Sequence, residues 1–349
     1  MQYYLAPLEG ITTFIYRRTY HKYFYPMKKY FTPFLSPHTK RGFNTREHNE
    51  ILPEHNPDMY VVPQIMSNQA EGFIQTAKKL KAYGYQEVNL NLGCPSKTVV
   101  SRGRGAGFLA YPEELERFLD EVFTRLDMRI SVKTRIGKEN PDEFERLLSI
   151  YNRFPMEELI IHPRVQQDFY KNVPNRKVFA QALERSENPV CYNGDLFTVL
   201  QIAALKEEFP QEDCVMLGRG ILRNPGLAQM AVGGGVPEKE TFRAFHDDLL
   251  AQYVEEMSGD RNVLFKMKEL WSYLSDSFVV DEEFSQGYSK MQAPAQRGEL
   301  RPFRYEKIIR KCTDLKRYEQ IIEELFANCS LRYGMDAVSC RIPEREAVL

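Results

Sequence analysis

Short strand-like runs alternate with longer amphipathic segments through the first two thirds of this chain of 349 residues. Runs of β-branched, aliphatic and aromatic residues predict strands, and apolar residues recurring every three or four positions predict helices. The expected strands are 3–6, 32–35, 60–65, 87–92, 129–133, 158–162, 189–193 and 214–217. The expected helices between them are 68–83, 112–126, 141–154, 175–184 and 196–209. Such regular alternation is typical of a parallel sheet.

The number and spacing of these units favour a closed barrel. Eight strands within about 235 residues match the TIM (β/α)8 barrel, which typically takes about 250 residues. The competing fold is an open, doubly wound sheet, whose first strand–helix turn carries the pattern GxGxxG. Residues 5–10 read Leu-Ala-Pro-Leu-Glu-Gly and lack that pattern. We therefore predict an α/β fold, a TIM (β/α)8 barrel followed by a small all-α helical domain.

The pattern changes after a glycine-rich linker at 233–237. Strand signals give way to helical periodicity at 242–257, 263–275 and 305–327, and 329–349 shows little periodicity. We expect a barrel domain at 1–235, a helical domain at 236–328 and a peripheral C-terminal tail at 329–349.

Composition is that of an ordinary soluble protein, with 43% hydrophobic and 27% charged residues. No run of about 18 apolar residues suits a membrane span, and the amino end lacks a signal-peptide pattern. The cysteines are scattered without a CxxC pair, at Cys94, Cys191, Cys214, Cys312, Cys329 and Cys340. We expect free thiols, no structural metal, no membrane contact and a cytoplasmic location, and we expect the protein to be a monomer.

The segment 89–96 indicates a polar pocket with a thiol at its mouth. Asn89 and Asn91 alternate with two leucines, so both amides face one side of a strand. A glycine and a proline then enclose Cys94 in a turn. A cysteine is often only a small buried hydrophobe, but two inward amides are costly to bury without partners.

Polar side chains recur where the expected strands end, which in a barrel is the face that carries the active site. The candidate residues at these strand ends, polar and apolar, are Ala6, Pro7, Leu8, Gln64, Asn91, Cys94, Lys133, His162, Arg164, Asn193, Gly194, Asp195, Gly218 and Arg219. The last two glycine-containing turns follow the seventh and eighth strands, where barrels commonly bind phosphate, and so predict a phosphorylated ligand. Taken alone, each turn is more often structural, and His162 has the alternative of a hydrogen-bonded core histidine.

The net charge of −1 gives no overall attraction to nucleic acid, but basic residues cluster locally. One cluster comprises Arg297, Arg301, Arg304, Lys307, Arg310, Lys311, Lys316 and Arg317. A second comprises Arg17, Arg18, Lys22, Lys28, Lys29, Lys40, Arg41 and Arg46. They are candidate RNA contacts, with Phe303, Tyr305 and Tyr318 as stacking surfaces; the alternative is solvated helix faces.

Several of these motifs, in their order along the chain, resemble those of the dihydrouridine synthases. They are residues 6–10 (APLEG), 64–65 (QI), 89–95 (NLNLGCP), 132–135 (VKTR), 161–164 (IHPR), 193–195 (NGD) and 218–220 (GRG). The resemblance covers roughly residues 1–320 and implies an FMN-dependent enzyme that reduces uridine in RNA, usually tRNA, with NADPH. It also implies a barrel followed by a helical RNA-binding domain.

The resemblance assigns roles to the strand-end residues. Ala6, Pro7 and Leu8 would lie along the flavin, Gln64 would bond its pyrimidine edge, Lys133 would sit beside its N1/O2 end, and His162 would touch it. The FMN phosphate would be held by Asn193, Gly194, Asp195, Gly218 and Arg219. Hydride would pass from flavin N5 to uracil C6 while Cys94 protonates C5, and Asn91 would help to position the uracil.

Two loops differ from or extend the common pattern. Proline follows His162 where the family often has glycine, and residues 165–171 replace a threonine-containing loop. We expect Arg164, Tyr170 and Lys171 to contact substrate there. Lys97, Arg102 and Arg104 lie in a glycine-rich segment that is either a mobile lid over the target base or a solvated loop.

Two other functions are compatible with the sequence. One is a flavin barrel oxidoreductase acting on a small molecule, such as a free pyrimidine or an enone. The other is a non-catalytic RNA-binding protein on a relic barrel. Transfer and ribosomal RNA, and NADPH and NADH, also stay open as alternatives.

Overall fold

The computed structural model describes residues 1–38, 42–280 and 304–332. Residues named above that lie outside this range are Lys40, Arg41, Arg297, Arg301, Phe303 and Cys340, together with most of the expected tail. Arg304 is the first residue of a described helix, α14 (Arg304–Lys311).

Nine parallel strands form one sheet in the order β3-β2-β1-β9-β8-β7-β6-β5-β4. Their bounds are β1 (Gln2–Leu5), β2 (Lys29–Phe31), β3 (Val61–Val62), β4 (Gln64–Ile65), β5 (Glu87–Leu92), β6 (Arg129–Arg135), β7 (Glu158–His162), β8 (Val190–Tyr192) and β9 (Cys214–Leu217). The expected strands at 87–92, 158–162 and 214–217 have the observed bounds.

The two ends of this sheet are halves of a single expected strand, separated only by Pro63. β3 pairs with β2 and β4 pairs with β5, so the chain itself joins the two edges. Proline has no N–H to donate, but its carbonyl accepts from Asn89 N at 2.9 Å. Leu35 bridges to Ile65 beyond the end of β2 and completes the ring. The strands therefore close into a barrel, and the predicted fold class is confirmed.

The second strand was predicted at the wrong place. It runs from Lys29 to Phe31 and not from 32 to 35. Pro33 follows Thr32 and lacks the N–H that a continuing ladder needs, so regular pairing ends before it.

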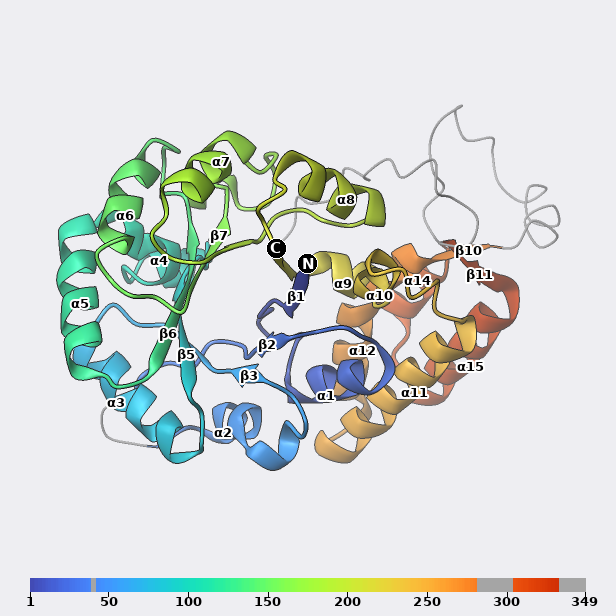
Figure 1. Ribbon diagram of the computed structural model, residues 1–349. Coiled ribbons are helices and arrows are strands. Elements are labelled where there is room, and N and C mark those ends of the chain that lie inside the picture. The colour runs from blue at the N-terminus through green and yellow to red at the C-terminus, as the bar shows by residue number, and fades with distance from the viewer. Residues whose placement is uncertain (39–41, 281–303, 333–349) are drawn as a thin grey trace.

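Helices surround the strands (Figure 1). Their bounds are α1 (Phe14–Tyr23), α2 (Thr45–Ile51), α3 (Ala70–Ala82), α5 (Pro112–Arg125), α6 (Glu143–Tyr151), α7 (Arg176–Arg185) and α8 (Val199–Glu208). Helix α5 shows why such segments fold this way. Proline begins it, Glu113 and Glu114 occupy its first turn, and Arg125 ends it, as the helix dipole favours. Its buried residues are Leu115, Phe118, Leu119 and Val122, one stripe at helical spacing.

A helical part lies beside the barrel (Figure 1). It comprises α11 (Lys239–Glu256), α12 (Asp260–Leu274), α14 and α15 (Leu315–Asn328). Helix α11 packs on α1, and α12 packs on the short helix α9 (Arg219–Arg223). Lys266 Nζ donates to the carbonyl of Gly10 at 2.5 Å, which places α12 next to the first strand–helix loop of the barrel. None of the described helices combines the length and hydropathy needed to cross a bilayer.

Three expectations about the C-terminal part were wrong. The helix expected at 305–327 is two helices, because the Asp314 side chain caps α15 by accepting from Arg317 N at 2.7 Å. Strands do occur there, since β10 (Phe278–Val280) pairs antiparallel with β11 (Cys329–Leu331). Tyr305 and Tyr318 are core residues and not stacking surfaces, with 4% and 0% of their surface exposed.

Candidate active site

The barrel mouth gathers the inward-facing side chains from the ends of several strands. Period-two alternation turns Gln64, Asn91, Lys133 and His162 to the barrel interior, and register sets Asn91 beside Lys133 on β5 and β6. The segment that holds Asn91 and Cys94 therefore lies beside residues that are far away in the sequence, such as Lys133.

Asn91 holds the turn that carries the thiol. Its Oδ1 accepts from the backbone N–H of Gly93 at 3.1 Å and of Cys94 at 3.0 Å. Its Nδ2 donates to Gln64 Oε1 at 2.6 Å, and Gln64 Nε2 donates to Asn89 Oδ1 at 2.8 Å. The inward amides that the sequence predicted are thus paired with one another, as buried polar groups require.

Cys94 is half-buried, whereas the other described cysteines are buried. Burial raises the pKa of the Cys94 thiol above its ordinary value of 9.0, against the opposing effect of a hydrogen bond with the Ser96 backbone. The thiol is therefore protonated at neutral pH. A protonated thiol is suited to donate a proton, whereas a nucleophile would need the thiolate.

Lys133 presents an unpaired ammonium group to the mouth. Within the part of the chain that the structure describes, its Nζ makes no hydrogen bond or ion pair. Burial, helped by the Arg135 guanidinium, lowers the pKa of Lys133 to about 8. A half-buried ammonium without a partner calls for an anionic or electron-rich ligand.

His162 is held in its neutral form. Burial, followed by the nearby charges of Arg135 and Lys133, lowers its pKa well below the ordinary value. Arg164 Nη1 donates to His162 Nε2 at 3.1 Å, so this nitrogen is an acceptor and the proton sits on Nδ1.

Asp195 joins two arginines at the end of the site expected to bind phosphate. Its Oδ1 accepts from Arg164 Nη1 at 3.1 Å, and the carboxylate also pairs with Arg219. The Arg219 guanidinium lies 4.4 Å from the centre of the Tyr170 ring. The Asp195 carboxylate therefore orients arginines and does not itself suit a phosphate, because two anions repel; phosphate binding by the backbone of this turn stays a prediction. Arg164 is 2% exposed, so it does not fit the expected direct RNA contact and belongs to this cluster instead.

The neighbouring turns leave little freedom for side chains. Asn193 Nδ2 donates to Met216 O at 2.8 Å, so its amide ties β8 to β9. A Cβ at Gly194 would lie 2.2 Å from Tyr192 Oη, which only glycine avoids. At this turn the backbone, more than the side chains, is available to a ligand.

Arg135 was missed as a site residue by the sequence reasoning. Its Nε donates to Gly93 O at 3.0 Å, Nη1 to Val165 O at 2.8 Å and Nη2 to Phe169 O at 2.7 Å. Gln166 Nε2 adds a bond to Pro95 O at 3.1 Å. These contacts tie the 165–169 loop to the Cys94 turn. The one available signal was that Arg135 follows Lys133 at strand spacing.

The glycine-rich segment after Cys94 wraps closely around it. It folds into α4 (Lys97–Val100) and the 3-10 helix η2 (Gly105–Ala110), and Ala106 N donates to Cys94 O at 3.0 Å. Gly105 has φ +55°, and a Cβ there would lie 2.9 Å from Cys94 O. Motion of this segment as a lid stays a prediction. The three basic residues expected to meet substrate here have different exposure: Lys97 and Arg102 are exposed, and Arg104 is half-buried.

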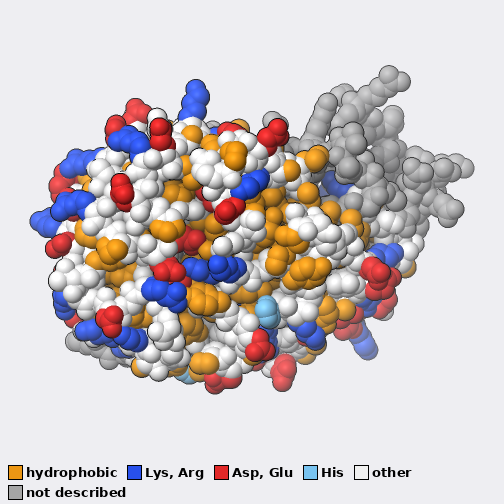
Figure 2. Space-filling model, in the orientation of Figure 1, with side chains coloured by type: hydrophobic (Ala, Val, Ile, Leu, Met, Phe, Trp, Pro, Cys, Tyr) orange, Lys and Arg blue, Asp and Glu red, His pale blue; other side chains and the backbone are white. Residues whose placement is uncertain are grey.

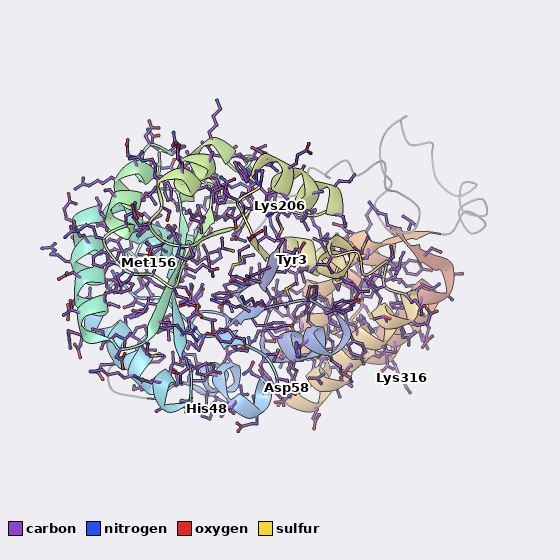
Figure 3. All side chains as sticks on the ribbon, in the orientation of Figure 1. Tyr3, His48, Asp58, Met156, Lys206 and Lys316 are labelled. Carbon is purple, nitrogen blue, oxygen red and sulfur yellow. The ribbon has the colours of Figure 1, made fainter. Side chains whose placement is uncertain are left out.

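The two expected basic clusters differ in how their described cations are exposed and paired. In the first, Lys307, Arg310, Lys311, Lys316 and Arg317 are exposed on α14 and α15. Figure 3 shows Lys316 on the outer side of the helical part.

Among the described residues of the second cluster, four cations are paired with carboxylates and do not form a free basic surface. Arg17 is fully buried and paired with Glu50 at 2.7 Å, and Lys29 is buried against Glu87. The pairs Lys22–Asp248 and Arg46–Glu9 neutralise two more cations. On the face that Figure 2 shows, Lys and Arg side chains are interspersed with those of Asp and Glu.

At the opposite end of the barrel, Glu158, Cys191 and Cys214 offer ligand atoms within 4.8 Å of one another. Tyr4 Oη donates to Glu158 Oε1 at 2.8 Å, and Lys29 Nζ lies 3.7 Å from Glu158 Oε2. The same ammonium lies 3.0 Å from Glu87 Oε2, so it is shared between buried carboxylates.

The comparisons with known proteins agree on one family. The family model described as dihydrouridine synthase matches residues 4–311. The chain is 27% identical over 286 residues to a probable tRNA-dihydrouridine synthase 1 of Synechocystis sp., covering 78% of this chain and 77% of that protein. It is 26% identical over 226 residues to tRNA-dihydrouridine synthase B of Pasteurella multocida, covering 64% of this chain and 67% of that protein. It is 26% identical over 223 residues to a tRNA-dihydrouridine(16) synthase of Vibrio parahaemolyticus, covering 62% and 67%.

Proposed function

This chain belongs to the dihydrouridine synthase family, and from that premise we propose that it reduces uridines of tRNA to 5,6-dihydrouridine with FMN and NADPH. One observation carries the proposal. A thiol kept protonated by burial stands at the barrel mouth, in the same interior as the ammonium group of Lys133, which has no partner among the described residues. These are a proton donor and a cation suited to an anionic cofactor.

The residues at the mouth fit FMN. Glycine at 218 leaves space beside the first strand, because a Cβ there would lie 3.4 Å from Ala6 Cβ and 3.8 Å from Leu8 Cδ1. Arg164 and Arg219 both meet the carboxylate of Asp195, which gathers two guanidinium groups at the end where a phosphate would bind. Lys133, Gln64 and the neutral His162 would line the ring. When bound, FMN would supply to uracil C6 the hydride that it takes from NADPH.

The chain's own residues handle the proton. Cys94 Sγ–H would protonate uracil C5 as the hydride arrives, and the thiolate would recover its proton from water, since Cys94 is half-buried and not sealed. The charges of Arg135 and Lys133 stabilise the transient thiolate. Asn91 fixes the turn, so the thiol keeps its position.

Mapping of dihydrouridine in total RNA, from cells with and without this gene, tests the proposal. We expect specific tRNA positions to lose dihydrouridine without the gene, and the purified protein to show a flavin absorption spectrum. Turnover of a free pyrimidine or enone with no change in RNA would support the small-molecule alternative. Absence of the flavin spectrum would support a non-catalytic RNA-binding protein.

The pH dependence should report Lys133. Its ammonium is present below a pKa of about 8 and is lost as the pH rises through that value, whereas the Cys94 thiol stays protonated beyond it. We expect kcat/KM for tRNA to fall as the pH rises above about 8, because kcat/KM follows the free enzyme. Lys133→Arg keeps its charge and should move this fall upward by at least about 1 pH unit. An unmoved profile would contradict the assignment.

RNA binding should depend on the exposed cations of the helical part. A target base must leave the RNA fold to reach the mouth, so the protein must hold the backbone. Replacing Lys307, Arg310 and Lys311 with glutamine should weaken tRNA binding about tenfold at low salt and flatten its salt dependence. The matched control replaces three exposed lysines of α3 (Lys78, Lys79 and Lys81). In Figure 1 this helix lies on the side of the barrel away from the helical part. Equal effects in both triple variants would argue against this surface.

A further inference from the structure

A column of polar side chains runs down the barrel interior beneath the Cys94 turn. Its members are Asn91, Gln64, Asn89, Ser131 and Glu87. All five are buried, between 0% and 8% exposed. They stand on β4, β5 and β6 at alternate positions, so each faces inward. Polar groups at this depth require partners.

Each member is bonded to the next. Asn91 donates to Gln64 at 2.6 Å, Gln64 to Asn89 at 2.8 Å, and Asn89 Nδ2 to Ser131 Oγ at 3.0 Å. Ser131 Oγ donates to Glu87 Oε1 at 2.9 Å. The top of the column accepts from the backbone N–H groups of Gly93 and Cys94.

The two ends determine the direction of the whole column. A backbone N–H can only donate, so Asn91 must turn its oxygen to Cys94 and its NH2 to Gln64. The same reasoning then orients Gln64 and Asn89 in turn. At the bottom, Glu87 also accepts from Lys29 Nζ at 3.1 Å and Tyr60 Oη at 3.0 Å, as a carboxylate does. Read from either end, the amides have one consistent orientation.

We infer that Ser131 and Glu87 are positioning residues for the Cys94 turn, acting through this one-way column of hydrogen bonds. Ser131 is the link that both accepts and donates. Without its hydroxyl, Asn89 keeps an unpaired buried N–H. The side-chain amides of Asn89 and Gln64 could instead exchange the positions of their oxygen and NH2 groups. The amide of Asn91 would then have to do the same, which would set its NH2 against the Cys94 N–H. Either result loosens the turn. The inference rests on the proposed function only for its catalytic consequence.

Ser131→Ala tests the inference, with Tyr4→Phe as the matched control. Both remove one buried hydroxyl from the barrel interior, but Tyr4 bonds to Glu158, which meets the column only through the ammonium of Lys29. Protein labelled with 15N-cysteine reports the Cys94 backbone amide. We expect this amide to exchange about tenfold faster in Ser131→Ala, and within about twofold of wild type in Tyr4→Phe. The rate at which iodoacetamide alkylates Cys94 should also change in Ser131→Ala and not in Tyr4→Phe.

Ser131→Thr retains the hydroxyl and should restore wild-type exchange, which also covers the case in which the alanine variant fails to fold. Wild-type exchange and alkylation in Ser131→Ala, or equal changes in Ser131→Ala and Tyr4→Phe, would overturn the inference. Faster exchange in Ser131→Thr would overturn it as well. Dihydrouridine formation is measured in parallel, with an expected tenfold fall in kcat and an unchanged KM for tRNA. If the wild type forms none, the proposed function fails, while the exchange data still decide the role of the column.

Discussion

Cys94→Ala should reduce dihydrouridine formation by about 10²–10⁴-fold, the usual contribution of a general acid, while NADPH still reduces the bound flavin at the wild-type rate. The reason is that the thiol supplies the proton for uracil C5 and has no part in the transfer from NADPH. Alanine also removes only a half-buried group, so the fold should survive. Stopped-flow absorbance follows the first half-reaction, and quantification of dihydrouridine in tRNA follows the second.

Cys94→Ser provides the control. A hydroxyl occupies nearly the same space but is a far weaker acid, so this variant should be nearly as slow as Cys94→Ala and should bind tRNA normally. If either variant turned over at the wild-type rate, Cys94 would not be the acid. If both variants lost flavin reduction too, the residue would be structural or would contact the cofactor.

The fold was predictable because strand alternation is local. Leu90 and Leu92 on one face of β5 and Asn89 and Asn91 on the other indicated the strand, its bounds and its inward polar face. Closure of the barrel at Pro63 was not predictable, because it depends on two different strands pairing with the residues on either side of one proline.

The site was predictable only as far as residue types and strand ends could place it. The turn at 193–195 suggested a phosphate site, but the partners of Asp195 come from two other strand ends. Those contacts give its carboxylate the role of orienting arginines, while phosphate binding by the backbone of the turn stays a prediction. Similarly, the basic run at 17–46 suggested a binding surface, but Arg17 bonds to Glu50 inside the fold. Tertiary pairing decided both cases.

Arg135 is the clearest example of a residue that only the structure identifies, and its loss should have the second largest effect. The guanidinium satisfies three backbone carbonyls from two segments, that of Gly93 in the Cys94 turn and those of Val165 and Phe169 in the 165–169 loop. Burial lowers the pKa of Arg135 to about 10, so it remains a cation at neutral pH. Arg135→Met would leave these carbonyls unpaired and free the 165–169 loop from the Cys94 turn.

We expect Arg135→Met to lower the free energy of unfolding by about 3 kcal/mol, from the lost buried hydrogen bonds. Because displacement of an acid by about 1 Å can cost about 100-fold in rate, dihydrouridine formation should fall by about that factor. Urea denaturation and tRNA assays measure the two effects. Arg129→Met is the control, since Arg129 lies on the same strand but is exposed near the opposite end, and its loss should cost under about 0.5 kcal/mol. Equal unfolding midpoints for the two variants would mean that water replaces the guanidinium, and the loop would then be held by Gln166 and its own backbone.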